Sequence, residues 1–172
     1  MRGFSLILVS VFALAACSRT SQPEMQVLWV SYAEWDPPPQ DPQEPWSTPG
    51  IVAAFCRGGE FRMASGSLYR SADGGAVLGS SDGIAVFRGH WSRTPAGLNV
   101  TYWVESAELL PPGQDIVGKK HTIVARQAAG SQALVFSYYR WLVEPGFIDI
   151  ELVPAQSAPF VVADRFVECP HS

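Results

Sequence analysis

Short β-forming runs separated by turns are the feature that most constrains the fold of this chain. From residue 51 onward, pairs such as Gly58-Gly59 and Pro145-Gly146 interrupt the runs at intervals of about 8–12 residues, a spacing typical of β-barrels and β-sandwiches. No sustained helical period is present outside residues 1–16. We therefore predict an all-β fold, a single antiparallel β-barrel, with a β-sandwich as the alternative. The barrel is favoured because closure removes exposed strand edges.

Strict alternation of apolar and polar residues identifies two strands most clearly. Residues of a strand point in turn to opposite faces of a sheet. In residues 98–105 one face holds Leu98, Val100, Tyr102 and Val104. In residues 147–153 the expected inward face holds Ile148, Ile150 and Leu152, and the outward face holds Asp149 and Glu151.

The remaining strands are predicted from β-branched and aromatic runs between turn residues. We expect one helical turn over residues 106–110. The full set of expected strands is 25–35, 51–57, 60–64, 67–72, 76–79, 84–92, 98–105, 119–126, 133–144, 147–153 and 160–169.

The first residues have the three parts of an export signal. Arg2 gives a positive start, residues 4–14 form a short apolar core, and Ala13, Ala15 and Ala16 are small residues of the kind found at cleavage sites. This core is too short to cross a bilayer, which takes about 20 apolar residues. Residues 1–16 are therefore predicted to be a signal peptide.

The end of that segment, Leu14-Ala15-Ala16-Cys17, resembles the lipobox of bacterial lipoproteins. The resemblance implies cleavage between Ala16 and Cys17 and a lipid anchor on Cys17, with the bilayer as partner and residues 17–24 as a short lipidated tether. Ser18 resembles the sorting signal for the outer membrane, so we expect a cell-envelope protein facing the periplasm. The alternative is an ordinary secretory signal followed by a chance cysteine.

Two cysteines remain once Cys17 is assigned to the anchor. An even number of cysteines in an oxidising compartment favours a disulfide, here between Cys56 and Cys169. Two buried free thiols or a reactive cysteine are the alternatives. The disulfide would tie the beginning of the domain, residues 25–172, to its end.

A proline-rich segment, DPPPQDPQEPWSTPG, occupies residues 36–50. Proline lacks the N–H that a sheet ladder needs, so this segment is predicted to be an extended loop. It is interpreted either as a stiff loop across one end of the domain or as a docking segment for an envelope protein, with Trp46 as its anchor.

A stretch of the middle of the chain, EFRMASGSLYR…SDGIAVFRGHWSRTPAGLNVTYWV, resembles the strand meander of small lipocalin-like bacterial lipoproteins. Gly89-His90-Trp91 supplies a Gly-x-Trp motif, and Leu98-Asn99-Val100 lies on the returning strand. The resemblance implies an up-and-down β-barrel with Trp91 plugging or lining one end.

Histidines, paired carboxylates and glycine-rich stretches are the sequence features that would carry catalysis or metal binding. His90, His121 and His171 lack other ligand-type residues at metal-binding spacing. The stretch GSSDG, residues 79–83, is interpreted as a turn rich in Gly and Ser that lacks the lysine of a phosphate-binding loop. Asp149 and Glu151, about 7 Å apart on one strand, are interpreted as a solvated face. We expect no enzyme activity, cofactor, catalytic residue or metal.

The charge of the chain argues against nucleic acid as a partner. The formal net charge is −4, and losing the positive charge of Arg2 with the signal peptide makes it −5, whereas nucleic-acid binding relies on Lys and Arg patches.

A set of aromatic residues is the candidate site for a small ligand. These residues either line a pocket for an apolar ligand or are ordinary β-core packing; they are Trp91, Tyr102, Phe136 and Tyr138. Two functions follow as hypotheses. One is a carrier or sensor of a small apolar or amphiphilic ligand, and the other is a non-enzymatic envelope interaction module, an assembly factor or inhibitor, that uses the proline-rich loop.

Overall fold

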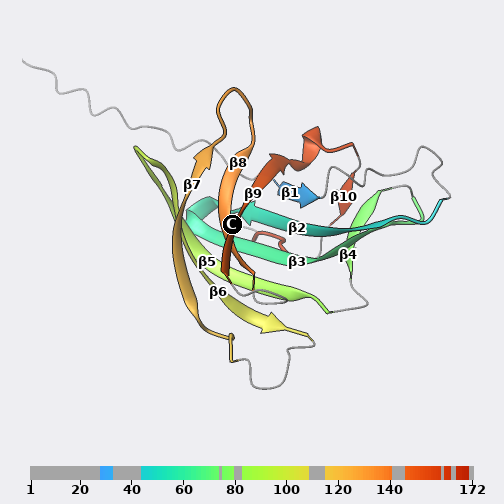
Figure 1. The fold of residues 1–172 in the computed structure, drawn as a ribbon, viewed down its shortest axis with the longest axis horizontal. Helices are drawn as coiled ribbons and strands as arrows, with labels where there is room; N and C mark the ends of the chain where they lie inside the picture. The colour runs from blue at the N-terminus through green and yellow to red at the C-terminus, as the bar shows by residue number, and fades with distance from the viewer. Residues whose placement is uncertain are drawn as a thin grey trace, which may run out of the picture.

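The computed structural model describes residues 28–32, 44–73, 75–79, 83–108, 115–140, 146–159, 161–163 and 166–170. Within these ranges the protein is all-β, and its strands wrap into a closed barrel (Figure 1). The strands are β1 (Leu28–Tyr32), β2 (Ser47–Phe55), β3 (Glu60–Arg70), β4 (Ala76–Gly79), β5 (Ala85–Thr94), β6 (Gly97–Ala107), β7 (Lys120–Gln127), β8 (Leu134–Arg140), β9 (Gly146–Pro154) and β10 (Val162–Ala163). Two short 3-10 turns, η1 (Arg57–Gly59) and η2 (Ala155–Ser157), are the helical elements of the described residues.

The barrel is antiparallel and follows the chain around its wall. Its order is β1-β2-β3-β5-β6-β7-β8-β9, and β9 returns to pair with β1. The prediction of a single antiparallel, up-and-down barrel is confirmed. β4 lies outside this circle, where it pairs with β3 and with the two-residue strand β10.

One prediction that the structure overturns is the break between residues 60–64 and 67–72. β3 is continuous and changes partner at Gly66: residues 60–65 pair with β5, and residues 67–70 pair with β4. A Cβ atom on Gly66 would lie 2.9 Å from the carbonyl oxygen of Gly79. The glycine therefore allows a close approach of β4 and does not end the strand.

The predicted loop 36–50 is too long at its end, because residues 47–50 belong to β2. Within the described residues, the pairing of β1 with β2 ends at Tyr32 with Gly50, so Pro49 has no described ladder neighbour on that side, a position where proline is tolerated. Residues 36–43 of the loop lie outside the described residues.

Two further predictions are wrong. Ser106 and Ala107 continue β6 instead of starting a helical turn, because they pair with Val86 and Ala85 across a β-bulge. Among the described residues of the expected strand 160–169, only Val162–Ala163 form a strand, and residues 166–170 are not in one.

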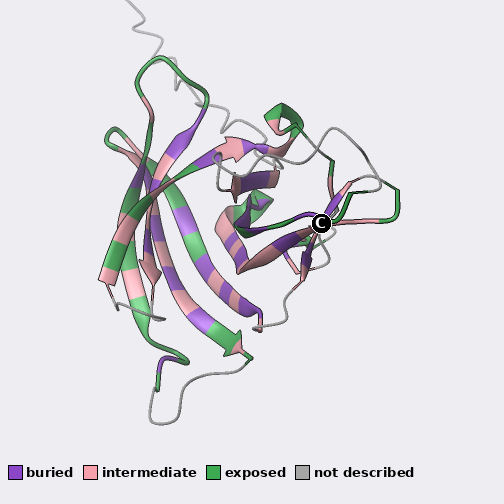
Figure 2. Ribbon diagram, turned by 45° about the vertical axis from the view of Figure 1, so that its right-hand side comes forward, coloured by how far each residue is buried: buried purple, intermediate pink, exposed green. Residues whose placement is uncertain are grey.

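Apolar side chains form two cores, one inside the barrel and one outside its wall. β2 separates them: Ile51, Ala53 and Phe55 point into the barrel, whereas Val52, Ala54 and Cys56 pack in the outer core. Burial on both faces explains the uninterrupted apolar run of this strand. Figure 2 shows the contrast with other strands, on which buried and accessible residues alternate.

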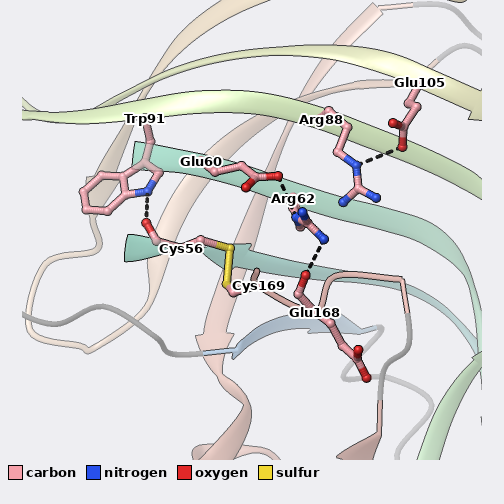
Figure 3. A network of polar contacts seen from close by, with 8 residues as sticks. All are labelled: Cys56, Glu60, Arg62, Arg88, Trp91, Glu105, Glu168 and Cys169. Carbon is pink, nitrogen blue, oxygen red and sulfur yellow. Dashed lines mark hydrogen bonds and ion pairs between the residues drawn. A yellow bond between two sulfur atoms is a disulfide. The ribbon is translucent and has the colours of Figure 1, made fainter. Parts of the chain in front are cut away.

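The outer core is held by the disulfide between Cys56 and Cys169, whose Cα atoms are 5.5 Å apart. The predicted disulfide is therefore present in the structure. The Arg62 guanidinium, which also contacts Glu60 at 2.7 Å, donates a hydrogen bond to the Glu168 carbonyl oxygen (Figure 3). These contacts fasten residues 166–170 to the barrel wall.

The predicted signal peptide, the lipobox and Cys17 lie outside the described residues. Among the residues that the structure does describe, no helix has the length and apolar character to cross a membrane.

Candidate ligand-binding site

The four predicted pocket residues all point into the barrel, where they are packed among other rings. Phe136 stacks on Phe61 with ring centroids 5.6 Å apart and contacts Tyr102 at the same distance. Tyr138 meets Phe87 edge-on at 5.9 Å. All are buried, so they form one aromatic core inside the barrel.

Trp91 lies in the same core and is 8 % exposed. Its ring is edge-on to Phe55 at 5.8 Å, and its Nε1 donates a hydrogen bond to the Cys56 carbonyl oxygen at 2.9 Å (Figure 3). The side chain thereby links β5 to the end of β2. Gly89 is required beside it, because a Cβ atom there would lie 2.2 Å from the Thr101 carbonyl oxygen.

The hydrogen-bonded wall of the barrel is interrupted between β7 and β8. In the described residues these strands pair only at Arg126 with Val135 and at Gln127 with Leu134. Continued pairing would set Val124 opposite Ser137 and Thr122 opposite Tyr139. We call the interval between residues 120–125 and 136–140 the seam; the two strands diverge there in Figure 1.

The other side of the β8–β9 hairpin is attached in a similar way. β9 pairs with β1 through Trp29 with Pro154 and Val30 with Val153, near the end of β9. β8 and β9 pair with each other over seven positions, from Leu134 with Leu152 to Arg140 with Gly146. Both attachments therefore lie at one end of the hairpin, and side-chain contacts hold the other end to the barrel.

The Tyr102 hydroxyl takes the place of the missing backbone partner at the seam. It donates to the Ser137 carbonyl oxygen at 3.3 Å and accepts from the Tyr139 N–H at 3.0 Å. Burial raises the pKa of Tyr102 to about 12, so the hydroxyl keeps its proton at neutral pH. Tyr102 thus satisfies two backbone groups that β7 leaves unpaired.

We expect Tyr102→Phe to loosen the hairpin without unfolding the barrel. Removing the hydroxyl leaves a partly buried carbonyl and N–H unpaired, and we expect a loss of about 1 kcal/mol in the free energy of unfolding, at the lower end of the range for an unpaired polar group. Hydrogen exchange should become faster at the amides of residues 137–140. Tyr138→Phe is the matched control, because its hydroxyl meets Ser65 Oγ at 3.1 Å. Equal exchange rates for Tyr139 in the two variants would contradict the assigned role.

A cleft of about 420 Å³ opens at the seam. Its volume falls within the range of small-molecule sites, about 300–1,000 Å³. Half of its lining is apolar and half is polar or charged: Ile123, Val124, Val135 and Phe147 with Thr122, Arg126, Ser137 and Asp149. Val124 and Phe147 remain 38 % and 54 % exposed, so they offer apolar surface to a ligand.

A cluster of three rings crosses the seam beside the cleft. His121 stacks on Tyr139 with centroids 4.7 Å apart, and Phe147 meets His121 edge-on at 5.4 Å. Burial, and then the positive charge of Lys119, lower the pKa of His121 below its usual value. Both effects favour the neutral imidazole.

An N–H group inside the barrel has no hydrogen-bond partner in the described part of the chain. It is Nε1 of Trp29, whose side chain is 6 % exposed and packs edge-on to Phe55 at 6.3 Å. A buried donor without a partner carries a desolvation cost of about 1–3 kcal/mol. Because Trp29 Nε1 has no partner, it could donate a hydrogen bond to an acceptor that enters the barrel.

The metal-binding side-chain types are not gathered into a metal site within the described ranges. No group of three or more His, Cys, Asp or Glu is placed to hold a metal ion there. Asp149 accepts a hydrogen bond from Ser137 Oγ at 2.6 Å, and His90 is exposed with its ring 5.7 Å from that of Trp103. His171 lies outside the described residues.

Trp46, the expected anchor of a docking segment, is 8 % exposed and packs in the outer core. Its carbonyl oxygen accepts a hydrogen bond from the Arg70 N–H at 3.2 Å. This buried position favours the interpretation of the proline-rich segment as a stiff loop across one end of the domain over that of a docking segment anchored by Trp46.

The residues lining the seam cleft were not identified from the sequence, apart from Asp149, which was interpreted as solvated. The outward residues of β7 alternate as in any half-exposed strand, and nothing in the alternation shows where a neighbouring strand stops pairing. The apolar outward residues Val124 and Phe147 are the one local signal, and single exposed apolar residues are common on protein surfaces.

Comparison of the chain with protein-family models, with curated proteins and with solved structures finds no match. Functional inference therefore depends on the chemistry of the cleft and its surroundings.

Proposed function

We propose that this protein is a lipid-anchored protein of the bacterial cell envelope that carries or senses a small apolar or amphiphilic ligand, which it holds in the seam cleft. The anchor and the periplasm-facing location are supported by the lipobox-like Leu14-Ala15-Ala16-Cys17. A lipid anchor of several acyl chains would keep the barrel at a membrane surface.

The observation that carries the proposal is the cleft itself, at the place where the barrel wall lacks a ladder. Elsewhere the interior is occupied by packed rings, whereas the seam combines open volume with accessible apolar side chains, Val124 and Phe147. Because the β8–β9 hairpin is attached at one end, its far end needs only side-chain contacts to rearrange for a ligand to enter. A ligand acceptor that reached the interior would meet the unpaired Trp29 Nε1.

Binding of a neutral apolar dye, N-phenyl-1-naphthylamine, tests this function. The protein is residues 18–172, which contain every described strand, exported to an oxidising periplasm. We expect saturable binding at one site. Val124→Glu should weaken it about tenfold, because a carboxylate in the cleft must lose its hydration.

Val117→Glu is the matched control, since Val117 is 50 % exposed and does not line the cleft. Equal weakening by both variants would place the dye elsewhere and contradict the proposal, as would a fluorescence increase that does not saturate. Native mass spectrometry of the gently purified protein adds a second test. A species heavier than the polypeptide by one lipid-sized mass would support the carrier function and allow its ligand to be identified.

A further inference from the structure

The two lysines of the chain lie at the start of β7, just before the part of that strand that lines the cleft. Lys119 and Lys120 are adjacent in sequence and exposed. They are the only lysines of the sequence, whose other basic side chains, apart from histidine, are arginines. Lys120 Nζ lies 5.7 Å from the centroid of the Trp103 ring. Neither lysine has an ion-pair partner among the described residues.

The ring cluster connects these lysines to the cleft. Lys119 is close enough to His121 for its charge to act on the imidazole, and His121 contacts Phe147, which lines the cleft. A second cation, Arg126, lines the cleft near the paired end of β7 and β8. Basic side chains therefore lie before and after the apolar part of the cleft lining along β7, Ile123 and Val124.

Two of the acidic groups in this region already have polar partners. Asp149, the acidic residue of the cleft lining, accepts the Ser137 hydroxyl, and Glu105 on the outer face of β6 pairs with Arg88 at 2.9 Å. Because the protein is acidic as a whole, with a formal net charge of −4, a local excess of unpaired cations is informative about a ligand.

From this placement we propose that the ligand is a single-chain anionic amphiphile, such as a fatty acid, with its chain along Val124, Val135 and Phe147 and its carboxylate at Lys119 and Lys120. The inference rests on the proposed function, since it assigns a chemical class to the ligand of the same cleft. A volume of about 420 Å³, near the lower end of the range for small-molecule sites, suits one acyl chain.

Three ligands with the same chain test the charge preference: dodecanoate, dodecanol and dodecyltrimethylammonium, each kept below micelle formation. They compete with N-phenyl-1-naphthylamine for residues 18–172 of the protein. We expect dodecanoate to bind about tenfold more tightly than the other two. Its affinity should fall as salt is raised, because exposed charges are screened.

Lys119→Gln with Lys120→Gln should weaken dodecanoate about three- to tenfold and leave dodecanol unchanged, as expected for two partly exposed charge pairs. The control removes the same charge elsewhere, with Arg57→Gln and Arg93→Gln, and should leave all three affinities unchanged. If this control weakens dodecanoate as much as the lysine variant, the site assignment is wrong.

Other outcomes separate the inference from the function on which it rests. Equal binding of dodecanoate and dodecanol would overturn the anionic preference and keep the proposed function. Failure of every ligand and of the dye to bind would overturn both. Co-sedimentation with anionic phospholipid vesicles, without binding of monomeric dodecanoate, would show that the lysines contact a membrane surface and would also overturn the inference.

Discussion

Replacing Cys56 and Cys169 with alanine is expected to lower the free energy of unfolding by about 5 kcal/mol. The bond closes a loop across a sequence separation of 113 residues, and a loop of this length corresponds to about 4.8 kcal/mol when the effect is ascribed to unfolded-chain entropy. Measured losses for native disulfides are typically about 2–5 kcal/mol. Urea unfolding of residues 18–172, which hold only these two cysteines, measures the difference.

Loss of the disulfide should also have a local effect, on the C-terminal segment 166–170. Without the bond, residues 166–170 keep the Arg62 contact to Glu168 and the packing of Val167, which is 2 % exposed. We expect proteolysis near the C-terminal segment before the barrel unfolds. Chemical reduction of the unaltered protein is the control for cavities that alanine leaves. A loss below about 1 kcal/mol in both experiments would show that the unfolded chain is not restrained by this bond.

Strand positions were predictable where one face of a strand meets the core and the other meets water. β6 and β9 satisfy this condition, and their inward residues are those that alternation predicts, Tyr102 and Leu152 among them. The disulfide was predictable for a different reason, namely the even number of cysteines left over in a chain that the sequence predicts to be exported. Neither inference needed knowledge of the strand order.

The errors occur where tertiary contacts override local signals. Gly66 suggests a break in the strand, but it allows β4 to approach β3. Pro49 suggests a loop, but it lies in β2 beyond the last described pair of β1 and β2, Tyr32 with Gly50. Residues 166–169 were included in the predicted strand 160–169, yet they are not in a strand, and Phe166, Val167 and Cys169 pack in the outer core. In each case the deciding fact is which segment lies alongside, and a single strand's sequence does not contain it.

In the candidate site, too, some features follow from the local sequence and others depend on tertiary contacts. The inward placement of Phe136 and Tyr138 followed from their strand, but the length of the β7–β8 ladder depends on how two strands curve around a crowded interior. Tyr102 contributes both to the core packing and to the seam. Its ring is part of the aromatic core, and its hydroxyl satisfies backbone groups of β8 at the seam. The same side chain thus fills the barrel and holds its wall closed.

Phe136→Ala should be the most damaging single substitution in the hairpin, because Phe136 is fully buried and stacked on Phe61. Truncating a buried phenylalanine costs about 3–5 kcal/mol, from lost burial and from the cavity that remains. Phe147→Ala is a control on the paired strand: its ring is 54 % exposed, so the loss should stay below about 1 kcal/mol, while binding of the dye at the cleft should weaken. Thermal or urea unfolding measures the stabilities and dye titration the binding. If Phe136→Ala proved as mild as Phe147→Ala, the rings inside the barrel would not be closely packed, and the interior, not the seam, would become the better candidate for the ligand.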